Sequence, residues 1–200
     1  MGEKSLSAKL MSTIVVLQTA SVLLNLIESS YGGATLFQWV QMGILAVTAV
    51  CLFILGSEHL FFRLSGIGWG AVAVVTLVSF LLSTPEMLAD PGKAWIFTLL
   101  YWVGLAINYP ASILEYLAYG KAAFSLRKKW TVLLVVNLAW VLLGSGASAL
   151  ALQMYNSQTW SHQTVYTIAQ IIQGVNLAVR LMYLWFLFQT YQIIRKRDAR

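Results

Sequence analysis

The stretch GKAAFSLRKK, residues 120–129, carries four basic side chains between two long apolar runs. Outward from it, Lys and Arg recur in every second gap between apolar runs, and all but two of the 13 follow this rhythm. The exceptions are Lys93, which is the single Lys or Arg in its gap, and Arg180, which lies inside the last run. Cytoplasmic loops of membrane proteins are enriched in Lys and Arg. The pattern therefore predicts a polytopic membrane protein with both termini in the cytoplasm.

Six apolar runs are long enough to cross a bilayer, which requires about 20 residues at a rise of about 1.5 Å per residue. They are residues 10–30, 35–62, 66–83, 94–119, 130–155 and 164–192. The connections between the runs are short, so we predict a single transmembrane domain over residues 1–200 and no soluble domain. The predicted fold class is an all-α, integral membrane bundle of six transmembrane helices.

The composition supports the same class of protein. Hydrophobic residues make up 59% of the chain and charged residues 10%, against about 45–50% and about 25% in soluble domains. The net charge of +6 is spread over loop ends and forms no continuous basic face. Anionic lipid headgroups at the cytoplasmic loops are thus the expected partners, and nucleic acid is not. We predict a multi-pass protein of the plasma (inner) membrane.

Aromatic residues near the ends of the runs are predicted to anchor the helices at the membrane surface. Trp and Tyr prefer headgroup depth because their rings are amphipathic. The residues in question are Tyr31, Trp39, Trp95, Trp130, Tyr155 and Trp160.

Polar side chains within the runs follow helical spacing and fall on single helix faces. The first run carries Gln18, Ser21, Asn25 and Glu28; the fourth carries Asn108, Ser112, Glu115 and Tyr119; the sixth carries Gln170, Gln173, Asn176, Arg180 and Tyr183. Runs two and three carry weaker stripes, Gln41, Thr48 and His59 in one and Thr76, Ser79 and Ser83 in the other. Such stripes either line a hydrated cavity or join helices by hydrogen bonds. We expect runs one, four and six to form a polar site.

Arg180 is the basic residue that lies well inside a run. A guanidinium at that depth costs at least about 2.5 kcal/mol on insertion scales, and an ion pair with Glu115 or Glu58 would offset this cost. One hypothesis is an anion site, with Arg180 as charge partner and Gln173 and Asn176 as hydrogen-bond partners. The competing hypothesis is a proton-linked carboxylate, either Glu115 or Glu58.

Missing motifs argue against most enzyme classes. The chain has two histidines, His59 and His162, which are predicted to lie on opposite sides of the membrane, and one cysteine, Cys51. A three-ligand zinc site or a pair of haem ligands is therefore not expected, and neither HExxH, GxSG nor a Walker A lysine motif is present. We predict no metal and no cofactor, and the missing motifs leave catalytic activity without support in the sequence.

The function that the sequence favours is a small membrane transport protein, either a carrier, a channel subunit or a solute-binding component. Its predicted substrate-binding residues, for a small solute or ion, are Gln18, Asn25, Glu58, Asn108, Glu115, Gln173, Asn176 and Arg180. Two alternatives stay open. The chain is a non-catalytic partner or assembly subunit, forming a homo-oligomer or binding another membrane protein, or it is an enzyme that modifies lipid headgroups through Glu58, His59 or Glu115.

Overall fold

A computed structural model describes residues 2–31, 35–84, 87 and 90–198 of the chain. These residues form six long helices and no strand: α1 (Gly2–Tyr31), α2 (Thr35–Ile54), α3 (Leu60–Leu82), α5 (Ala94–Ala122), α6 (Arg127–Asn156) and α7 (His162–Asp198). All six are long and apolar enough to cross a membrane. The predicted all-α class with six candidate membrane-spanning helices is therefore confirmed.

The boundary between the second and third helices differs from the prediction. The apolar run extends to residue 62, but α2 ends at Ile54, a 3-10 turn, η1, covers Leu55–Ser57, and α3 begins at Leu60. His59 adopts an extended backbone conformation, and its side chain accepts a hydrogen bond from the Phe61 N–H as the N-cap of α3. Apolar residues flank this short turn on both sides, so hydropathy averaged over a membrane-length window does not detect it, whereas the capping side chain of His59 marks the start of the next helix.

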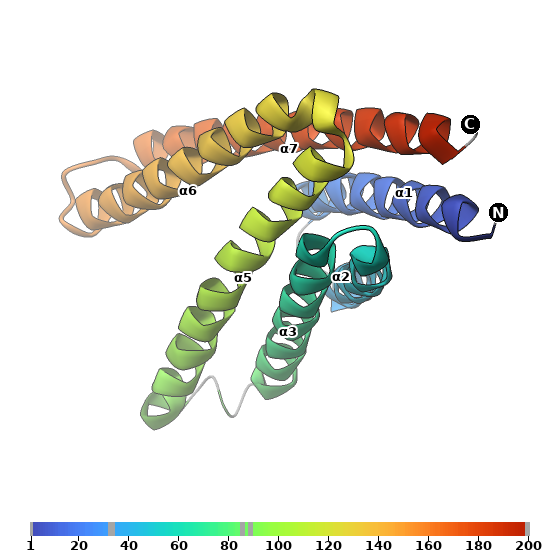
Figure 1. The fold of residues 1–200 in the computed structure, drawn as a ribbon. Helices are drawn as coiled ribbons and strands as arrows, with labels where there is room; N and C mark the ends of the chain where they lie inside the picture. The colour runs from blue at the N-terminus through green and yellow to red at the C-terminus, as the bar shows by residue number, and fades with distance from the viewer. Residues whose placement is uncertain (1, 32–34, 85–86, 88–89, 199–200) are drawn as a thin grey trace.

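The helices form a closed ring. Each packs against the next along the chain, and α7 returns to pack against α1. Figure 1 shows α3 beside α5 and α6 beside α7, with the two pairs diverging from the region where α5 meets α6.

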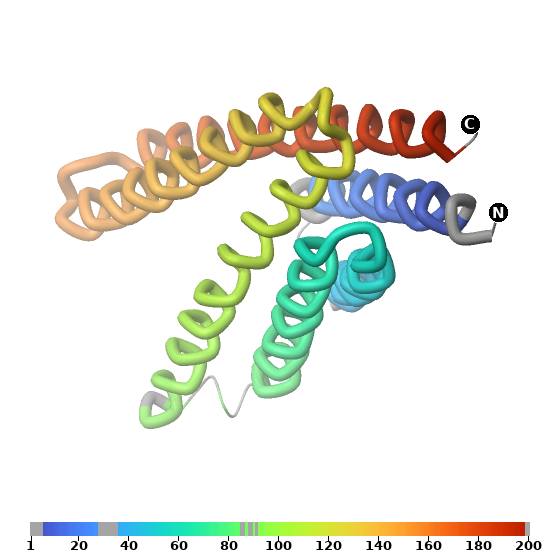
Figure 2. Tube along the Cα trace, viewed as in Figure 1, coloured from blue at the N-terminus to red at the C-terminus, as the bar shows by residue number. Residues whose placement is uncertain are grey.

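One end of the ring gathers the chain termini and the basic connections, and we call it the basic end. Glu58, next to η1, accepts hydrogen bonds from Ser7 on α1 at 2.7 Å and from Arg197 on α7 at 2.9 Å. The ammonium group of Lys121, near the end of α5, lies 4.3 Å from the centre of the Phe61 ring on α3. Figure 2 shows the two ends of the traced chain on the same side of the molecule. The loops with most of the basic residues therefore share one end of the bundle.

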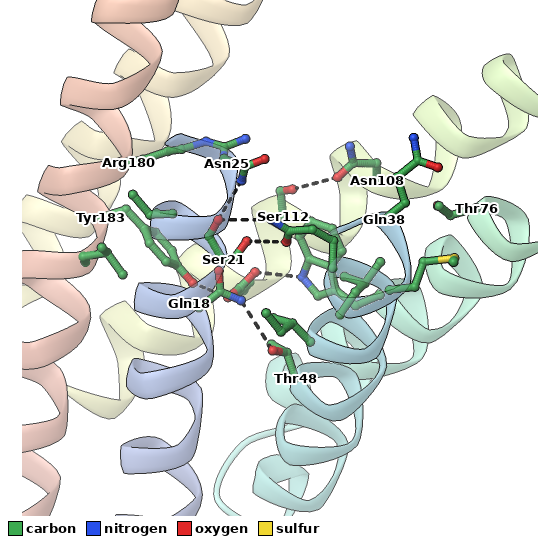
Figure 3. Close-up of a pocket in the computed structure, with 18 of the residues that line it drawn as sticks. Gln18, Ser21, Asn25, Gln38, Thr48, Thr76, Asn108, Ser112, Arg180 and Tyr183 are labelled. Carbon is green, nitrogen blue, oxygen red and sulfur yellow. Dashed lines mark hydrogen bonds between the residues drawn. The ribbon is translucent and has the colours of Figure 1, made fainter. Parts of the chain in front are cut away.

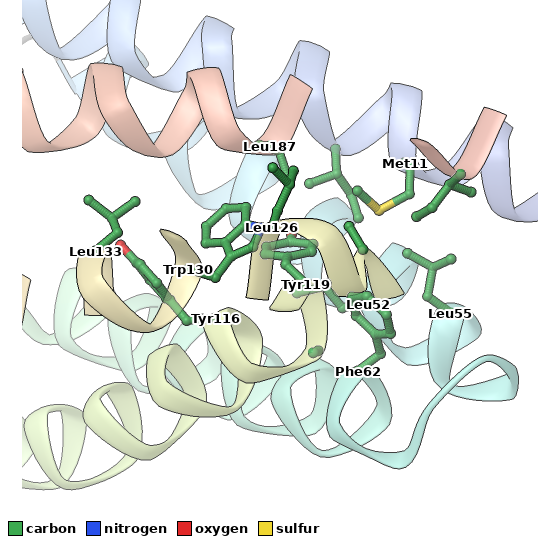
Figure 4. Close-up of a cluster of buried hydrophobic side chains, with 14 of the residues drawn as sticks. Met11, Leu52, Leu55, Phe62, Tyr116, Tyr119, Leu126, Trp130, Leu133 and Leu187 are labelled. Atoms are coloured by element: carbon green, nitrogen blue, oxygen red, sulfur yellow. The ribbon is translucent and has the colours of Figure 1, made fainter. Parts of the chain in front are cut away.

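The buried core lies toward the basic end (Figure 4). Its largest fully buried side chains are Met11, Ile14, Leu52, Leu55, Phe62, Tyr119, Trp130 and Leu187. Trp130, predicted to anchor at the membrane surface, is instead 1% exposed, and its indole N–H donates to Thr190 at 3.0 Å. A Trp can leave the interface when its single donor finds a buried acceptor.

The α2 and α3 helices pack closely because Gly66 lies between them. A Cβ atom at Gly66 would lie 2.5 Å from the backbone nitrogen of Phe53 and 2.7 Å from the carbonyl oxygen of Ala49. Small residues at membrane-helix interfaces allow this kind of backbone approach. The close contact seals one side of the ring next to the core.

Candidate functional site

A cavity of about 780 Å³ occupies the space inside the ring (Figure 3). All six long helices contribute to its wall. The polar and charged lining residues are Gln18, Ser21, Asn25, Gln38, Gln41, Thr48, Thr76, Ser79, Ser83, Asn108, Ser112, Glu115, Asn137 and Arg180, together with the aromatic residues Trp69, Tyr116 and Tyr183. Polar side chains of this kind inside a membrane bundle are expensive unless they face protein or water.

Glu115 lies at the floor of the cavity and is 4% exposed. Its Oε1 accepts hydrogen bonds from the hydroxyl groups of Tyr183, at 2.5 Å, and Tyr119, at 3.0 Å. Its Oε2 accepts from the indole N–H of Trp69 at 2.7 Å. These donors come from α3, α5 and α7, so one carboxyl group joins three helices. Each of its two oxygens therefore accepts at least one hydrogen bond from a neutral donor of the protein.

Arg180 lies on the wall, one helical turn from Tyr183 and midway between His162 and Asp198 on α7. Its side chain is exposed to the cavity space and reaches toward Asn25 on α1 (Figure 3). Among the described residues it forms no ion pair. The expected pairing with Glu115 or Glu58 is therefore not observed, because Glu115 is held by neutral donors and Glu58 by Arg197.

Hydrogen bonds between lining residues hold several polar groups in place. Ser21 donates to the Gln41 side chain at 2.8 Å, and Gln41 donates back to the Ser21 carbonyl at 3.1 Å, which ties α1 to α2. On α5, Ser112 donates to Asn108 at 3.3 Å. Side chains fixed in this way present preformed donors and acceptors, which lowers the entropy cost of binding a solute.

The buried core separates the cavity from the basic end. Glu115 and Tyr116 line the cavity floor, while Tyr119, one turn further along α5, is fully buried among Phe62 and Trp130. On the side of the floor that faces away from the basic end, lining residues continue over two helical turns, on α1 from Gln18 to Asn25 and on α5 from Glu115 to Asn108. Two turns correspond to a cavity depth of about 10 Å. The cavity thus extends away from the basic end and is closed toward it by aromatic side chains.

The structure brings five of the eight predicted site residues together at the cavity: Gln18, Asn25, Asn108, Glu115 and Arg180. The other three lie elsewhere. Gln173 is exposed and does not line the cavity, and Asn176 accepts a hydrogen bond from the Trp140 indole at 2.8 Å. Glu58 lies at the basic end, bound to Ser7 and Arg197. Glu28, on the predicted stripe of the first run, has a side chain outside the described part of the structure.

Sequence reasoning did not single out Gln38, Trp69, Tyr116 and Asn137 as lining residues. Two of these were detectable in principle, because Gln38 precedes Gln41 by one helical turn and Asn137 is a lone amide within an apolar run. The aromatic residues carry no such signal, since an aromatic residue in an apolar run is ordinary core. The Thr76, Ser79 and Ser83 stripe, which seemed weak in sequence, also lines the cavity.

The lining chemistry is suited to binding by hydrogen bonds and charge. It comprises amides, hydroxyl groups, one carboxyl group and one guanidinium group. Within the part of the chain that the structure describes, no three His, Cys, Asp or Glu side chains lie close enough together to hold a metal ion. Ligand pockets of about 300–1,000 Å³ accept small organic molecules, and this cavity falls in that range.

Comparisons of the chain with family models, with curated proteins and with solved structures found no match. Six helices long and apolar enough to cross a membrane fit a multi-pass membrane protein, and they surround a polar cavity. What the cavity does is therefore argued from its own residues.

Proposed function

We propose that this protein is a small integral membrane transport protein that binds a small polar solute inside its ring of helices. The observation that carries the proposal is the cavity of about 780 Å³, lined by polar side chains from all six helices and ending on Glu115. Structural hydrogen bonding between helices needs only pairwise contacts. Polar side chains from five helices, together with Asn137 from α6, face one space, and this arrangement is better explained by a hydrated binding site.

The orientation of the proposed transporter follows from its charges. The basic end, which carries Lys121, residues 127–129 and residues 195–197, faces the cytoplasm and contacts anionic headgroups. The cavity then opens to the outside, and both termini lie in the cytoplasm. The membrane is the plasma (inner) membrane.

A transport cycle requires the cavity to become accessible from the second side as well. The closure toward the basic end consists of the aromatic residues Tyr116, Tyr119 and Trp130 and of the Glu58 contacts with Ser7 and Arg197. The hydrogen bonds that Tyr183 and Trp69 donate to Glu115 also lie at this closed end of the cavity. These contacts join α5 to α3, α6 and α7, and they tie Glu58 to α1 and α7. Their rearrangement would open the cavity to the cytoplasm while the outer ends of the helices approach one another.

Cysteine accessibility tests this proposal. In a Cys51→Ala background, Ser21→Cys and Ser112→Cys place isosteric thiols on cavity residues. An impermeant maleimide is applied to either face of oriented vesicles. We expect both cysteines to react from the outer face, and to react more slowly from the cytoplasmic face, because the minor inward-open state is also populated.

Two matched positions provide the controls. Val16→Cys lies on α1 but faces away from the cavity, and Leu55→Cys lies in the buried core, so neither should react quickly from either face.

Reaction of Ser21→Cys and Ser112→Cys from one face only would remove the transport function and leave a one-sided binding protein. Absence of reaction at Ser21→Cys and Ser112→Cys would indicate a dry interior, as expected of a partner or assembly subunit. Such a subunit would co-purify stoichiometrically with another chain or with itself.

A further inference from the structure

We infer that the solute carries an oxyanion, such as a carboxylate or a phosphate group, and that Arg180 is the residue that binds it. This inference rests on the proposed function and names the substrate class of the same cavity. It follows from the charges that face the cavity, from their partners and from the space around them.

The cavity wall contains two charged residues, Glu115 and Arg180. Glu115 is 4% exposed and accepts hydrogen bonds from Trp69, Tyr119 and Tyr183. Both of its oxygens accept hydrogen bonds from the protein, and its burial keeps it from a solute in the open part of the cavity. A cationic solute would therefore find no free carboxylate among the described lining residues.

Arg180 is in the opposite situation. It lies midway along α7, far from the headgroups expected at either end, and its guanidinium forms no ion pair among the described residues. Arginine inside a membrane bundle normally pairs with an acidic group or faces a water-filled path. Its planar fork of donors matches the two oxygens of a carboxylate or phosphate. The missing partner is therefore best supplied by the solute.

The neighbourhood of Arg180 fits an organic anion rather than a simple halide. Asn25 lies beside it on α1, and Asn108 on α5 and Gln38 on α2 line the cavity across from it at a similar level in Figure 3. Their amides supply further donors and acceptors for polar groups of the solute. A volume of about 780 Å³ would be left mostly unfilled by one monatomic ion.

The charge preference of the cavity can be measured without knowing the solute. Ser21→Cys in the Cys51→Ala background is treated from the outer face with two methanethiosulfonates of similar size, the anionic sulfonatoethyl and the cationic trimethylammonioethyl reagent. Each rate is divided by its rate with a small thiol in solution. We expect the anionic reagent to be favoured, and Arg180→Gln to lower the anion-to-cation ratio by about tenfold, since one unit charge at this range acts on both reagents in opposite senses.

Two variants control for charge alone. Arg180→Lys should keep most of the preference, because it keeps the charge, and Lys121→Gln, at the basic end, should leave the ratio unchanged. The anion-to-cation ratio of the protein that keeps Arg180 is informative by itself. A folding defect in Arg180→Gln therefore does not prevent a test of the anion site. A ratio near one in the protein that keeps Arg180, or a ratio unaffected by Arg180→Gln, would overturn the inference of an anion site but would leave the hydrated cavity in place. A clear anion preference with access from one face only would keep the anion site and remove transport.

Discussion

The hydroxyl group of Tyr183 donates a hydrogen bond of 2.5 Å to Oε1 of Glu115, which joins α7 to α5 at the floor of the cavity. Tyr119 and Trp69 donate to the same carboxyl group, so this one acceptor holds three helices together. Removing one donor should weaken the bundle. Tyr183→Phe is expected to cost about 1–2 kcal/mol in the free energy of unfolding, measured by titration with SDS in mixed micelles. Tyr155→Phe, an exposed tyrosine, serves as the control, and an equal loss there would contradict the assignment.

Replacement of Glu115 by Gln should expose a mismatch of donors at Trp69. The amide of Gln has one oxygen, which can still accept from Tyr119 and Tyr183, but its NH₂ group would then face the Trp69 N–H. We expect Glu115→Gln to destabilise the bundle by about 1–3 kcal/mol. Adding Trp69→Phe removes the second donor and should recover part of this loss in a double-mutant cycle. Strictly additive losses in the cycle would show that the two side chains do not interact.

The buried indole of Trp130 depends on Thr190 as its acceptor. Thr190→Val keeps the shape of the side chain but leaves the N–H of Trp130 unpaired in the core, so we expect a loss of about 1–3 kcal/mol by the same unfolding titration. Thr131→Val is the matched control, because Thr131 is exposed and bonds its own helix backbone at Arg127. Equal stability of the two variants would mean that Trp130 does not rely on Thr190.

Two glycines on α3 should respond in opposite ways to alanine. At Gly66 a Cβ atom would overlap the backbone of α2, with the Phe53 nitrogen at 2.5 Å, whereas no atom lies within 4 Å of a Cβ atom at Gly70. Gly66→Ala is therefore expected to cost about 1–3 kcal/mol, since backbone cannot yield as a flexible side chain does. Gly70→Ala should be neutral or slightly stabilising, because alanine favours the helix. A neutral Gly66→Ala variant would show that α2 and α3 pack less closely.

The His59 cap predicts a specific dependence on pH. Burial lowers the pKa of His59 below its ordinary value of 6.5, and the positive charge of Lys121 lowers this pKa further. The neutral ring accepts from the Phe61 N–H through Nδ1, which a protonated ring cannot do. Because the pKa is lower in the folded than in the unfolded chain, the contribution of His59 to stability is complete above pH 6.5. It is lost as the pH falls through the folded-state pKa.

NMR titration of the His59 ring in a His162→Gln background measures this pKa directly. We expect a value below 6.5, and we expect Lys121→Gln to raise it. His59→Asn, which keeps a capping side chain without a titrating group, should reduce the acid sensitivity of unfolding. A pKa above 6.5 would contradict the capping role of the neutral ring.

The sequence alone was sufficient for the class of protein and for the helices, because both depend on local properties. The length of an apolar run determines whether it can cross a bilayer, and the Lys and Arg rhythm distinguishes one set of loops from the other. Helical spacing likewise placed Gln18 and Asn25 on one face of α1 and Asn108 and Glu115 on one face of α5. These four residues do line the cavity.

Only the tertiary structure decided how the faces meet, since the rotation of each helix about its own axis is determined by packing against its neighbours. Gln173 and Asn176 share a broad arc with Arg180 in sequence, yet Asn176 turns to Trp140 while Arg180 turns to the cavity. From the sequence, Glu58 and Glu115 were both candidates for pairing with Arg180, but Glu115 lies at the cavity floor and Glu58 at the basic end. The partners of Glu115, and the absence of an ion pair at Arg180 among the described residues, likewise depend on contacts between helices far apart in the chain, which no local pattern of residues contains.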